Sequence, residues 1–190
     1  MSKIHETKTP SRSFEASELY ARAMQNLAEV IKLLSQAHDM ESITAIVREA
    51  ARSLTGADGA TFVLRDGDKC YYLEENAIGP LWKGQRFPMC ACISGWAMTH
   101  RSSAVIDDIY KDPRIPEDAY RPTFVRSLVM VPINRADPVG AIGNYWSKKR
   151  HPTDEEIVIL QILADITGVA MENAAFRHNY KDATQFATNL

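Results

Sequence analysis

Residues 93–133 read ISGWAMTHRSSAVIDDIYKDPRIPEDAYRPTFVRSLVMVPI, and this stretch decides the fold of the chain. Ser94-Gly95-Trp96 opens a short predicted helix, and Ala104-Val105-Ile106 predicts a strand that stops at Asp107. A polar segment marked by prolines follows and leads into a second, largely apolar strand over residues 127–133. The order of helix, strand, helical insert and strand is that of a mixed α and β domain.

The residues before this stretch predict two helices and a hairpin. Apolar residues recur every three or four positions from about residue 14, and again between a predicted N-cap at Asp39 and a predicted stop at Gly56. Asp66-Gly67 separates two strand-like segments and suits a tight two-residue turn. Between residues 74 and 92, two proline-marked turns are expected to flank a short helix.

A second hairpin is predicted after this stretch, where residues 139–146 follow the strand at 127–133. Gly140 and Gly143 inside the new strand indicate a bulge or a close approach of the backbone to another group.

The last predicted element is a long helix. Thr153 and Glu156 have the spacing of a capping box, and an apolar stripe continues from there to about Phe176. Together, the elements predict an α+β fold with one central antiparallel β-sheet, flanking helices and long N- and C-terminal helices.

The composition is that of an ordinary globular chain. Of the 190 residues, 45% are hydrophobic and 24% are charged, so we expect one domain with terminal extensions and a sizeable core. The net charge of −2 gives no electrostatic reason to expect nucleic acid or a membrane as a partner. No apolar run approaches the ~20 residues that cross a bilayer. Three cysteines and a polar start favour reduced thiols in the cytoplasm.

The order of elements, with Val139-Gly-Ala-Ile-Gly-Asn-Tyr-Trp146 and a helix opening at Thr153-Asp-Glu-Glu156, resembles the GAF domain of bacterial sensors of the histidine-kinase-associated type. The resemblance covers about residues 42–176. It implies a GAF/PAS-like sheet and a small-molecule sensor in signal transduction. The expected organisation is a disordered tail at 1–13, a signalling and dimerisation helix at 14–38, a GAF domain at 39–177, and a C-terminal helix extension or tail at 178–190.

The terminal helices are expected to carry the signal, because in GAF domains they usually pack together and against a second protomer. The apolar stripes from Leu19 to Leu34 and from Ile157 to Val169 are compatible with such a homodimer. The alternative is that each stripe covers its own sheet. The sequence has no phosphotransfer or ATP-binding signature, so a kinase is either absent or lies outside this stretch, and a kinase or another transmitter is a candidate output partner.

In GAF domains, ligands lie between the sheet and the helical insert, and the resemblance places a pocket there. Its polar groups are expected to be Asp107, at a strand end, and Arg126, which suits a carboxylate or phosphate. The alternative is that the aromatic residues form plain core and that Arg126 pairs with an Asp. The expected pocket wall consists of Trp96, Tyr120, Phe124, Met130 and Tyr145.

Cys90 and Cys92 complete the predicted ligand-binding set. In an extended segment both side chains would point the same way, because Cβ atoms alternate along a strand. A metal site, a redox pair or a chromophore linkage would use such thiols, but a C-x-C pair without a nearby Cys or His pair is poor zinc geometry. Packing of two small side chains near the pocket is the simpler interpretation.

Known GAF chemistries match this sequence only in part. Bilin-binding members use a Cys in the segment that corresponds to residues 112–125, where this chain has none. Free methionine sulfoxide reductases have a Cys at the position of Ser94 and a catalytic Cys within the segment that corresponds to 107–124, which also lacks one. His100 is the nearest candidate for a haem ligand, and the cyclic-nucleotide signature is incomplete.

The predicted function is therefore a sensor without a complete catalytic set, with no metal site and with an unidentified ligand and cofactor. Two alternatives stay open. One is a structural or dimerisation GAF domain that binds no ligand. The other is a thiol-based redox enzyme of the free methionine sulfoxide reductase type that uses Cys90 or Cys92.

Overall fold

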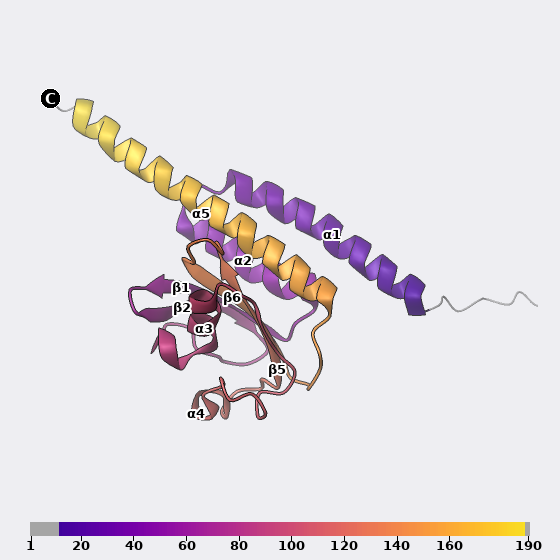
Figure 1. Ribbon diagram of the computed structural model, residues 1–190. Coiled ribbons are helices and arrows are strands. Elements are labelled where there is room, and N and C mark those ends of the chain that lie inside the picture. Colours follow the sequence, from indigo (N-terminus) through magenta and orange to yellow (C-terminus); the bar gives the residue numbers. More distant parts are fainter. Residues whose placement is uncertain (1–11, 189–190) are drawn as a thin grey trace, which may run out of the picture.

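The computed structural model describes residues 12–188, and Figure 1 shows a sheet domain covered by a layer of helices. Most of the predicted tail at residues 1–13 lies outside the described residues. The elements are α1 (Arg12–Gln36), α2 (Met40–Thr55), β1 (Gly59–Asp66), β2 (Lys69–Ala77), β3 (Arg86–Pro88), the 3-10 turn η1 (Met89–Ala91), α3 (Ile93–His100), β4 (Ala104–Ile106), α4 (Glu117–Tyr120), β5 (Ser127–Ile133), β6 (Gly140–Trp146) and α5 (Asp154–Thr188).

One antiparallel sheet of six strands forms the centre, in the order β3-β2-β1-β6-β5-β4. The predicted α+β fold with a central antiparallel sheet is confirmed. The strands at 104–106 and 127–133 begin and end at the predicted residues. Both strands are strongly apolar, and such strands stabilise the fold most when both of their faces are buried.

The two faces of the sheet cover different cores, as the alternation of β6 illustrates. Ile142 and Trp146 point to the side of the long helices, whereas Ala141 and Tyr145 belong to the core on the opposite side. Asn144 also faces the helices, where its side-chain amide donates to the carbonyl oxygen of Ala51 at 2.6 Å. We call the core beside the long helices the helix-side core, and the core on the opposite face of the sheet the insert-side core.

The helix-side core holds α2 and α5 against the sheet, and α1 lies along them (Figure 1). Leu27 and Leu34 of α1 are almost fully buried there. Burial of a leucine stabilises the fold by roughly 1.5–3 kcal/mol, so α1 is a true part of the domain. Leu19, at the start of the predicted stripe, belongs to the first residues of α1, whose side chains are not described.

Helix capping follows the predicted pattern. The Asp39 carboxylate accepts from the backbone N–H of Ser42 at 2.8 Å, and Gly56 ends α2 in the left-handed conformation with φ of 63°. At α5, the N–H of Thr153 donates to Glu156 at 2.8 Å and the N–H of Glu156 donates to the Thr153 hydroxyl at 3.3 Å. The predicted capping box is confirmed.

Two local predictions were wrong. The hairpin turn lies one residue later than predicted, because Asp66 pairs with Lys69 and Gly67 takes the positive φ of 62°. No helix forms between residues 79 and 88, where the chain makes turns and then the short strand β3. Pairing with β2 over Arg86–Pro88 supplies backbone partners that a local reading of the sequence does not reveal.

Gly140 makes the predicted close approach of backbone. A Cβ atom there would lie 2.4 Å from the carbonyl oxygen of Val63 on the neighbouring strand β1, which no side chain tolerates. The sheet can therefore keep β6 against β1 only with glycine at this position.

By length and composition, α5 between Asp154 and Tyr180 is apolar enough to cross a membrane, with a mean hydropathy of 1.5 in its most apolar window. The expectation that no apolar segment approaches the length needed to cross a membrane therefore overlooked α5. Half of that window is buried inside the domain. Packing of Leu160, Leu163 and Ala164 in the helix-side core accounts for the apolar composition.

Candidate functional site

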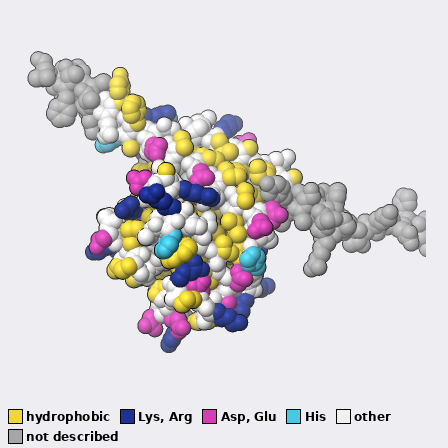
Figure 2. Space-filling model, in the orientation of Figure 1, with side chains coloured by type: hydrophobic (Ala, Val, Ile, Leu, Met, Phe, Trp, Pro, Cys, Tyr) yellow, Lys and Arg dark blue, Asp and Glu magenta, His cyan; other side chains and the backbone are white. Residues whose placement is uncertain are grey.

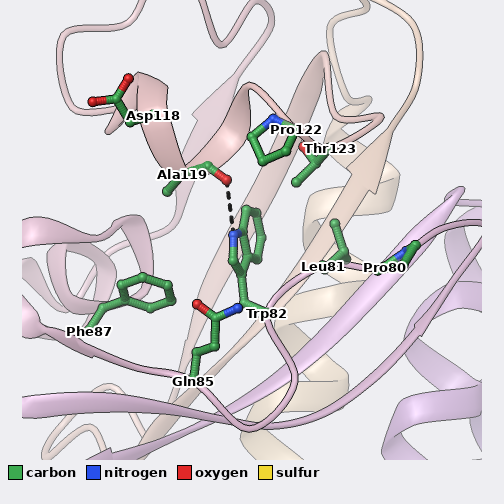
Figure 3. A pocket seen from close by; sticks show the side chains of 9 residues that line it. All are labelled: Pro80, Leu81, Trp82, Gln85, Phe87, Asp118, Ala119, Pro122 and Thr123. Carbon is green, nitrogen blue, oxygen red and sulfur yellow. Dashed lines mark hydrogen bonds between the residues drawn. The ribbon is translucent and has the colours of Figure 1, made fainter.

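The candidate site lies on the insert side of the sheet, where the loop before β3 faces the short helix α4. Figure 3 shows Trp82 standing between these two segments, with its indole N–H donating to the carbonyl oxygen of Ala119 at 3.1 Å. The ring also packs against Tyr72, Tyr120 and Tyr145 at centroid distances of 4.7–5.6 Å. Such contacts add roughly 0.5–1.5 kcal/mol per pair beyond burial, so Trp82 is held firmly in place.

Glu75 of β2 fixes the loop that carries Trp82. Its carboxylate accepts three backbone N–H bonds, from Leu81 at 3.1 Å and from Trp82 and Lys83 at 2.9 Å each. Charge-assisted bonds of this kind are stronger than bonds between neutral groups. A loop without regular secondary structure therefore presents Trp82 in one defined orientation.

A cleft of about 380 Å³ opens beside Trp82. Apolar and aromatic groups form most of its wall, and Gln85, Asp118 and Thr123 supply the polar groups. In Figure 3 the Asp118 carboxylate points away from the Trp82 indole. Of the nine side chains described around the cleft, none is cationic. The lining residues are Pro80, Leu81, Trp82, Gln85, Phe87, Asp118, Ala119, Pro122 and Thr123.

A row of thiols and hydroxyls lies beneath the cleft in the insert-side core. The Cys92 sulfur lies 3.3 Å from the Ser94 hydroxyl, which lies 3.1 Å from the Tyr72 hydroxyl. The Cys92 thiol also donates to the carbonyl oxygen of Pro88 at 3.5 Å, and Cys70 of β2 is fully buried in the same core. Bonds from Cys70, Ser94 and the backbone N–H of Gly95 lower the pKa of Cys92 to about 6, against the effect of burial, whereas the bond to Cys92 and burial raise the pKa of Cys70.

A second, narrower hollow adjoins this row and reaches Cys92 between Trp82, Phe87 and Tyr120. The buried hydroxyl of Tyr120 has no hydrogen-bond partner among the residues that the structure describes. The neighbouring Tyr145 hydroxyl, in contrast, is paired with Thr61 at 2.9 Å. Burial raises the pKa of both tyrosines, so their hydroxyl groups stay protonated and able to donate a hydrogen bond.

The structure brings four of the predicted site residues into one core. Cys92, Tyr120, Met130 and Tyr145 all belong to the insert-side core, and Cys92 and Tyr120 line the narrow hollow. Phe124 is half-buried at the edge of the same core, where its ring closes over Gly59. Ligand binding by these residues stays a prediction.

The other predicted site residues lie apart from the cleft. Asp107 is exposed and pairs with His151 at 2.9 Å, while Arg126 donates to the Tyr110 hydroxyl at 3.0 Å, so the two side chains do not converge. Trp96 of α3 is half-buried against the insert-side core, with its ring stacked on His100 at a centroid distance of 4.3 Å and the Arg114 guanidinium over it. Asp107, Arg126 and Trp96 each contact nearby residues that do not line the cleft.

Cys90 and Cys92 point in different directions, contrary to what an extended segment would give. The segment forms the turn η1, which exposes Cys90 and buries Cys92 at the N-cap of α3. The Cys92 sulfur bonds to the Pro88 carbonyl oxygen at 3.5 Å and lies 3.3 Å from the Ser94 hydroxyl. Among the residues that the structure describes, no group of three or more His, Cys, Asp or Glu side chains is placed to hold a metal ion.

Sequence reasoning missed the cleft residues of the loop at 80–87. One signal for them was present, because Leu81 and Trp82 are large apolar residues between two proline-marked turns. Large apolar residues in a loop are stable only when they pack against another part of the chain, and Trp82 packs against α4. No local signal predicted that Cys70 and Cys92 lie in the same core, because they are 22 positions apart and only the fold brings them there.

Comparison with known proteins agrees with this geometry. A family model described as GAF domain matches residues 37–172. The GAF domain of a phosphoenolpyruvate-protein phosphotransferase from Coxiella burnetii superposes with a TM-score of 0.74 at 14% identity, over 84% of this chain and 98% of that chain. No curated protein matches the chain.

Two further solved structures illustrate the range of proteins with this fold. The free methionine-R-sulfoxide reductase of Neisseria meningitidis, in complex with its substrate, has a TM-score of 0.71 at 17% identity, over 93% of this chain and 99% of that one. The GAF-B domain of DevS from Mycobacterium smegmatis has a TM-score of 0.62 at 19% identity, over 75% and 99%. At these identities the likeness concerns the fold alone.

Proposed function

This chain belongs to the GAF domain family, and we propose that it is a small-molecule sensor whose ligand occupies the cleft beside Trp82. The cleft carries the proposal. It combines an apolar wall, a few polar groups and a firmly held aromatic ring, which is the usual make-up of a small-molecule site. A sensing role also fits the family, whose members are mostly regulatory domains of larger signalling proteins.

The lining favours a neutral or cationic molecule with a flat apolar part. An indole and a phenyl ring offer stacking surfaces, and Gln85 and Thr123 offer hydrogen bonds. Asp118 supplies a carboxylate to the lining, and none of the nine described lining residues is a cation. A phosphate or carboxylate ligand would therefore lack a charged partner here. This argues against a cyclic nucleotide.

The predicted site residues extend the same proposal into the core. Tyr120 contacts Trp82 and lines the hollow that leads to Cys92, so a ligand that enters more deeply would meet its unpaired hydroxyl. Tyr145 and Met130 belong to the same insert-side core. We therefore keep Cys92, Tyr120, Met130 and Tyr145 as the inner wall of the proposed site.

The cleft is tested by mass spectrometry of the freshly purified protein under native and then denaturing conditions. We expect extra mass on the native protein that leaves on denaturation. Ala119→Trp places an indole in the cleft and is expected to abolish the bound mass. Glu117→Trp, at an exposed position of the same short helix, is the matched control and keeps it. Equal occupancy in both variants, or no bound mass in the parent protein, contradicts the proposal.

The proposed output is a change in the terminal helices of a homodimer. An apolar stripe on α5 faces away from the domain, and Val169 and Phe176 on it are 57% and 72% exposed. Met24 and Ile31, seven residues apart on α1, are also exposed apolar residues. Figure 2 shows hydrophobic side chains gathered over the helical layer. A second copy of the chain suits these two stripes because parallel or antiparallel helices would cover them continuously.

Sedimentation equilibrium tests the dimer. Phe176→Glu puts a charge in the proposed interface and should convert a dimer to monomers, whereas Ala175→Glu, an exposed position about 100° around the helix, should not. A parent protein that is monomeric at micromolar concentrations contradicts this part of the proposal. The domain would then have to reach a cytoplasmic kinase or another transmitter by a route other than a change in a dimer.

A further inference from the structure

The narrow hollow beside Trp82 has few polar side-chain atoms in its wall, and most of them already have a partner. Three side chains, those of Tyr72, Trp82 and Cys92, place a polar atom there that is hydrogen-bonded within the protein. Their partners are the Ser94 hydroxyl for Tyr72 at 3.1 Å, the Ala119 carbonyl oxygen for Trp82 at 3.1 Å, and the Pro88 carbonyl oxygen for Cys92 at 3.5 Å.

The fourth polar side chain in this wall is Tyr120, and its hydroxyl differs from the others. It has no hydrogen-bond partner among the residues that the structure describes, although Tyr120 is only 3% exposed. A buried hydroxyl without a partner destabilises a folded protein, because the group has given up its hydrogen bonds to water. A bound molecule that accepts a hydrogen bond at this point would remove that cost.

We propose that the Tyr120 hydroxyl selects the ligand of the sensor site, by donating a hydrogen bond to an uncharged carbonyl oxygen on a flat aromatic molecule. The inference rests on the sensor function proposed above and deepens it, because it names the chemical class of the ligand. The ring occupies the cleft beside Trp82, and the carbonyl oxygen enters the narrow hollow.

The sizes of the two spaces divide the ligand in this way. The cleft measures about 380 Å³ and takes an aromatic ring, whereas the narrow hollow measures about 10 Å³, which is roughly the room for one water-sized group. Trp82, Phe87 and Ala119 belong to the walls of both spaces, so the two adjoin. A single small molecule can therefore place its ring in the cleft and one oxygen atom in the hollow.

Tyr120 is held in position by its neighbours on both sides. Its backbone carbonyl oxygen accepts from the N–H of Thr123 at 2.9 Å and from the Thr123 hydroxyl at 2.7 Å. Its ring packs against Trp82 at a centroid distance of 4.7 Å, and the Glu75 carboxylate fixes the backbone of Trp82 in turn. Because the donor is already ordered, binding a ligand does not have to order it, which favours affinity.

The charges around the two spaces favour an uncharged oxygen over an anionic one. Burial raises the pKa of Tyr120, so the hydroxyl keeps its proton and acts as a donor. Asp118 adds a carboxylate to the cleft, and none of the described residues that line either space is a lysine or an arginine. A carboxylate ligand would meet repulsion without a cation to balance it, whereas a carbonyl oxygen accepts the same hydrogen bond without a net charge.

Three probes of nearly equal size and shape test this class of ligand on the whole protein. Benzamide carries a neutral carbonyl oxygen, benzamidine carries a cationic group with donors and no acceptor, and benzoate carries an anion. Their affinities are measured by NMR titration at millimolar concentrations. We expect benzamide to bind most tightly and benzoate most weakly.

Tyr120→Phe removes the hydroxyl and keeps the ring that packs against Trp82. It should weaken benzamide binding by roughly three- to ten-fold, the effect of one hydrogen bond between neutral groups, and leave benzamidine binding unchanged. The matched control is Tyr110→Phe, which removes the hydroxyl of an exposed tyrosine that lines neither space. This variant should bind benzamide as the parent does.

Equal benzamide affinity in the parent and in Tyr120→Phe would overturn the proposal. Tighter binding of benzoate or benzamidine than of benzamide, or no binding of benzamide at all, would also overturn it. The ranking of the three probes in the parent decides the class of ligand even if thermal unfolding shows that Tyr120→Phe does not fold.

Failure of the sensor site itself would look different. If Ala119→Trp leaves benzamide binding unchanged, the probe does not occupy the cleft, and both the cleft and the role of Tyr120 are contradicted. If Ala119→Trp abolishes benzamide binding while Tyr120→Phe leaves it unchanged, the cleft stands as the binding site and only the hydrogen bond from Tyr120 is contradicted.

Discussion

At Gly95, the backbone of α3 rests on the backbone of Met89 in η1. A Cβ atom at this position would lie 2.0 Å from the Met89 carbonyl oxygen. Intrinsic helix propensity favours alanine over glycine by about 1 kcal/mol, so propensity and contact predict opposite signs for Gly95→Ala. We expect the contact to dominate and the variant to lose roughly 1–3 kcal/mol in urea unfolding.

Gly79→Ala is the matched control for Gly95. Its nearest neighbour is the Phe124 ring at 3.7 Å, an ordinary contact, and its backbone needs no positive φ. The free energy of unfolding should change by less than ~0.5 kcal/mol there. Should Gly95→Ala be as stable as the parent, η1 would have to be mobile enough to move away from α3.

The state of Cys92 gives a second prediction on the residue scale. Its alkylation by iodoacetamide should rise with pH through a midpoint of about 6, because only the thiolate reacts. Cys70→Ala removes the first of the bonds that lower this pKa, so the midpoint should move up and the rate at pH 7 should fall about ten-fold. The facing hydroxyls of Tyr72, Tyr120 and Tyr145 stay neutral in this range. An unchanged midpoint in Cys70→Ala would show that Cys70 does not influence the pKa of Cys92.

On the scale of elements, the contribution of the cap at the start of α5 can be measured as a free energy of unfolding. Thr153 and Glu156 cap each other, and Arg150 holds the Glu156 carboxylate with two bonds of 2.9 and 2.6 Å. Thr153→Ala should therefore lower the free energy of unfolding by ~1 kcal/mol, whereas Thr153→Ser keeps the hydroxyl and most of the stability. Both values come from urea denaturation. Equal loss in the two variants would mean that the threonine methyl group, not the cap, matters.

Elements with local signals were predictable from the sequence, and elements made by distant pairing were not. The capped helix α2, the capping box of α5 and the apolar strand β5 carry their own signals, since caps and alternation act within a few residues. Strand β3 exists only because β2 offers it partners, and the loop at 80–87 holds its shape because Glu75 binds three of its N–H groups. The candidate site depends on these distant contacts, which explains why it was predicted less well than the fold.

On the scale of the whole molecule, one sheet separates the proposed ligand site from the helices that are the proposed output. β6 places Tyr145 in the insert-side core and Asn144 in the helix-side core. The Asn144 amide donates to Ala51 and to Thr55 on α2, so a shift of β6 reaches a long helix through neighbouring residues. A ligand bound on the insert side, as proposed above, would therefore have a short path through β6 to the helices on the other face.

Asp58 connects these layers at one end of the sheet, and its protonation should weaken the whole domain. It follows α2, and its carboxylate accepts from both the backbone N–H and the hydroxyl of Ser147 at 2.7 Å, just past β6. Burial works against the charged form, but these bonds together with Arg52 and Lys148 lower the pKa of Asp58 below its ordinary value of 3.8. Because the unfolded chain takes up the proton first, this stability is present above about pH 4 and is lost as pH falls through the folded pKa. Thermal unfolding between pH 7 and pH 3 should show it.

The Asp58→Asn variant should be less stable than the parent at pH 7, and the gap should narrow toward pH 3, where the parent has lost the same charge. Asp137→Asn, at a loop position whose carboxylate makes only an exposed ion pair, is the matched control and should follow the parent curve. If the gap between Asp58→Asn and the parent stays constant with pH, the carboxylate acts through its shape and hydrogen bonds alone. The charge at the junction of α2, β1 and β6 would then contribute nothing to holding the helical layer to the sheet.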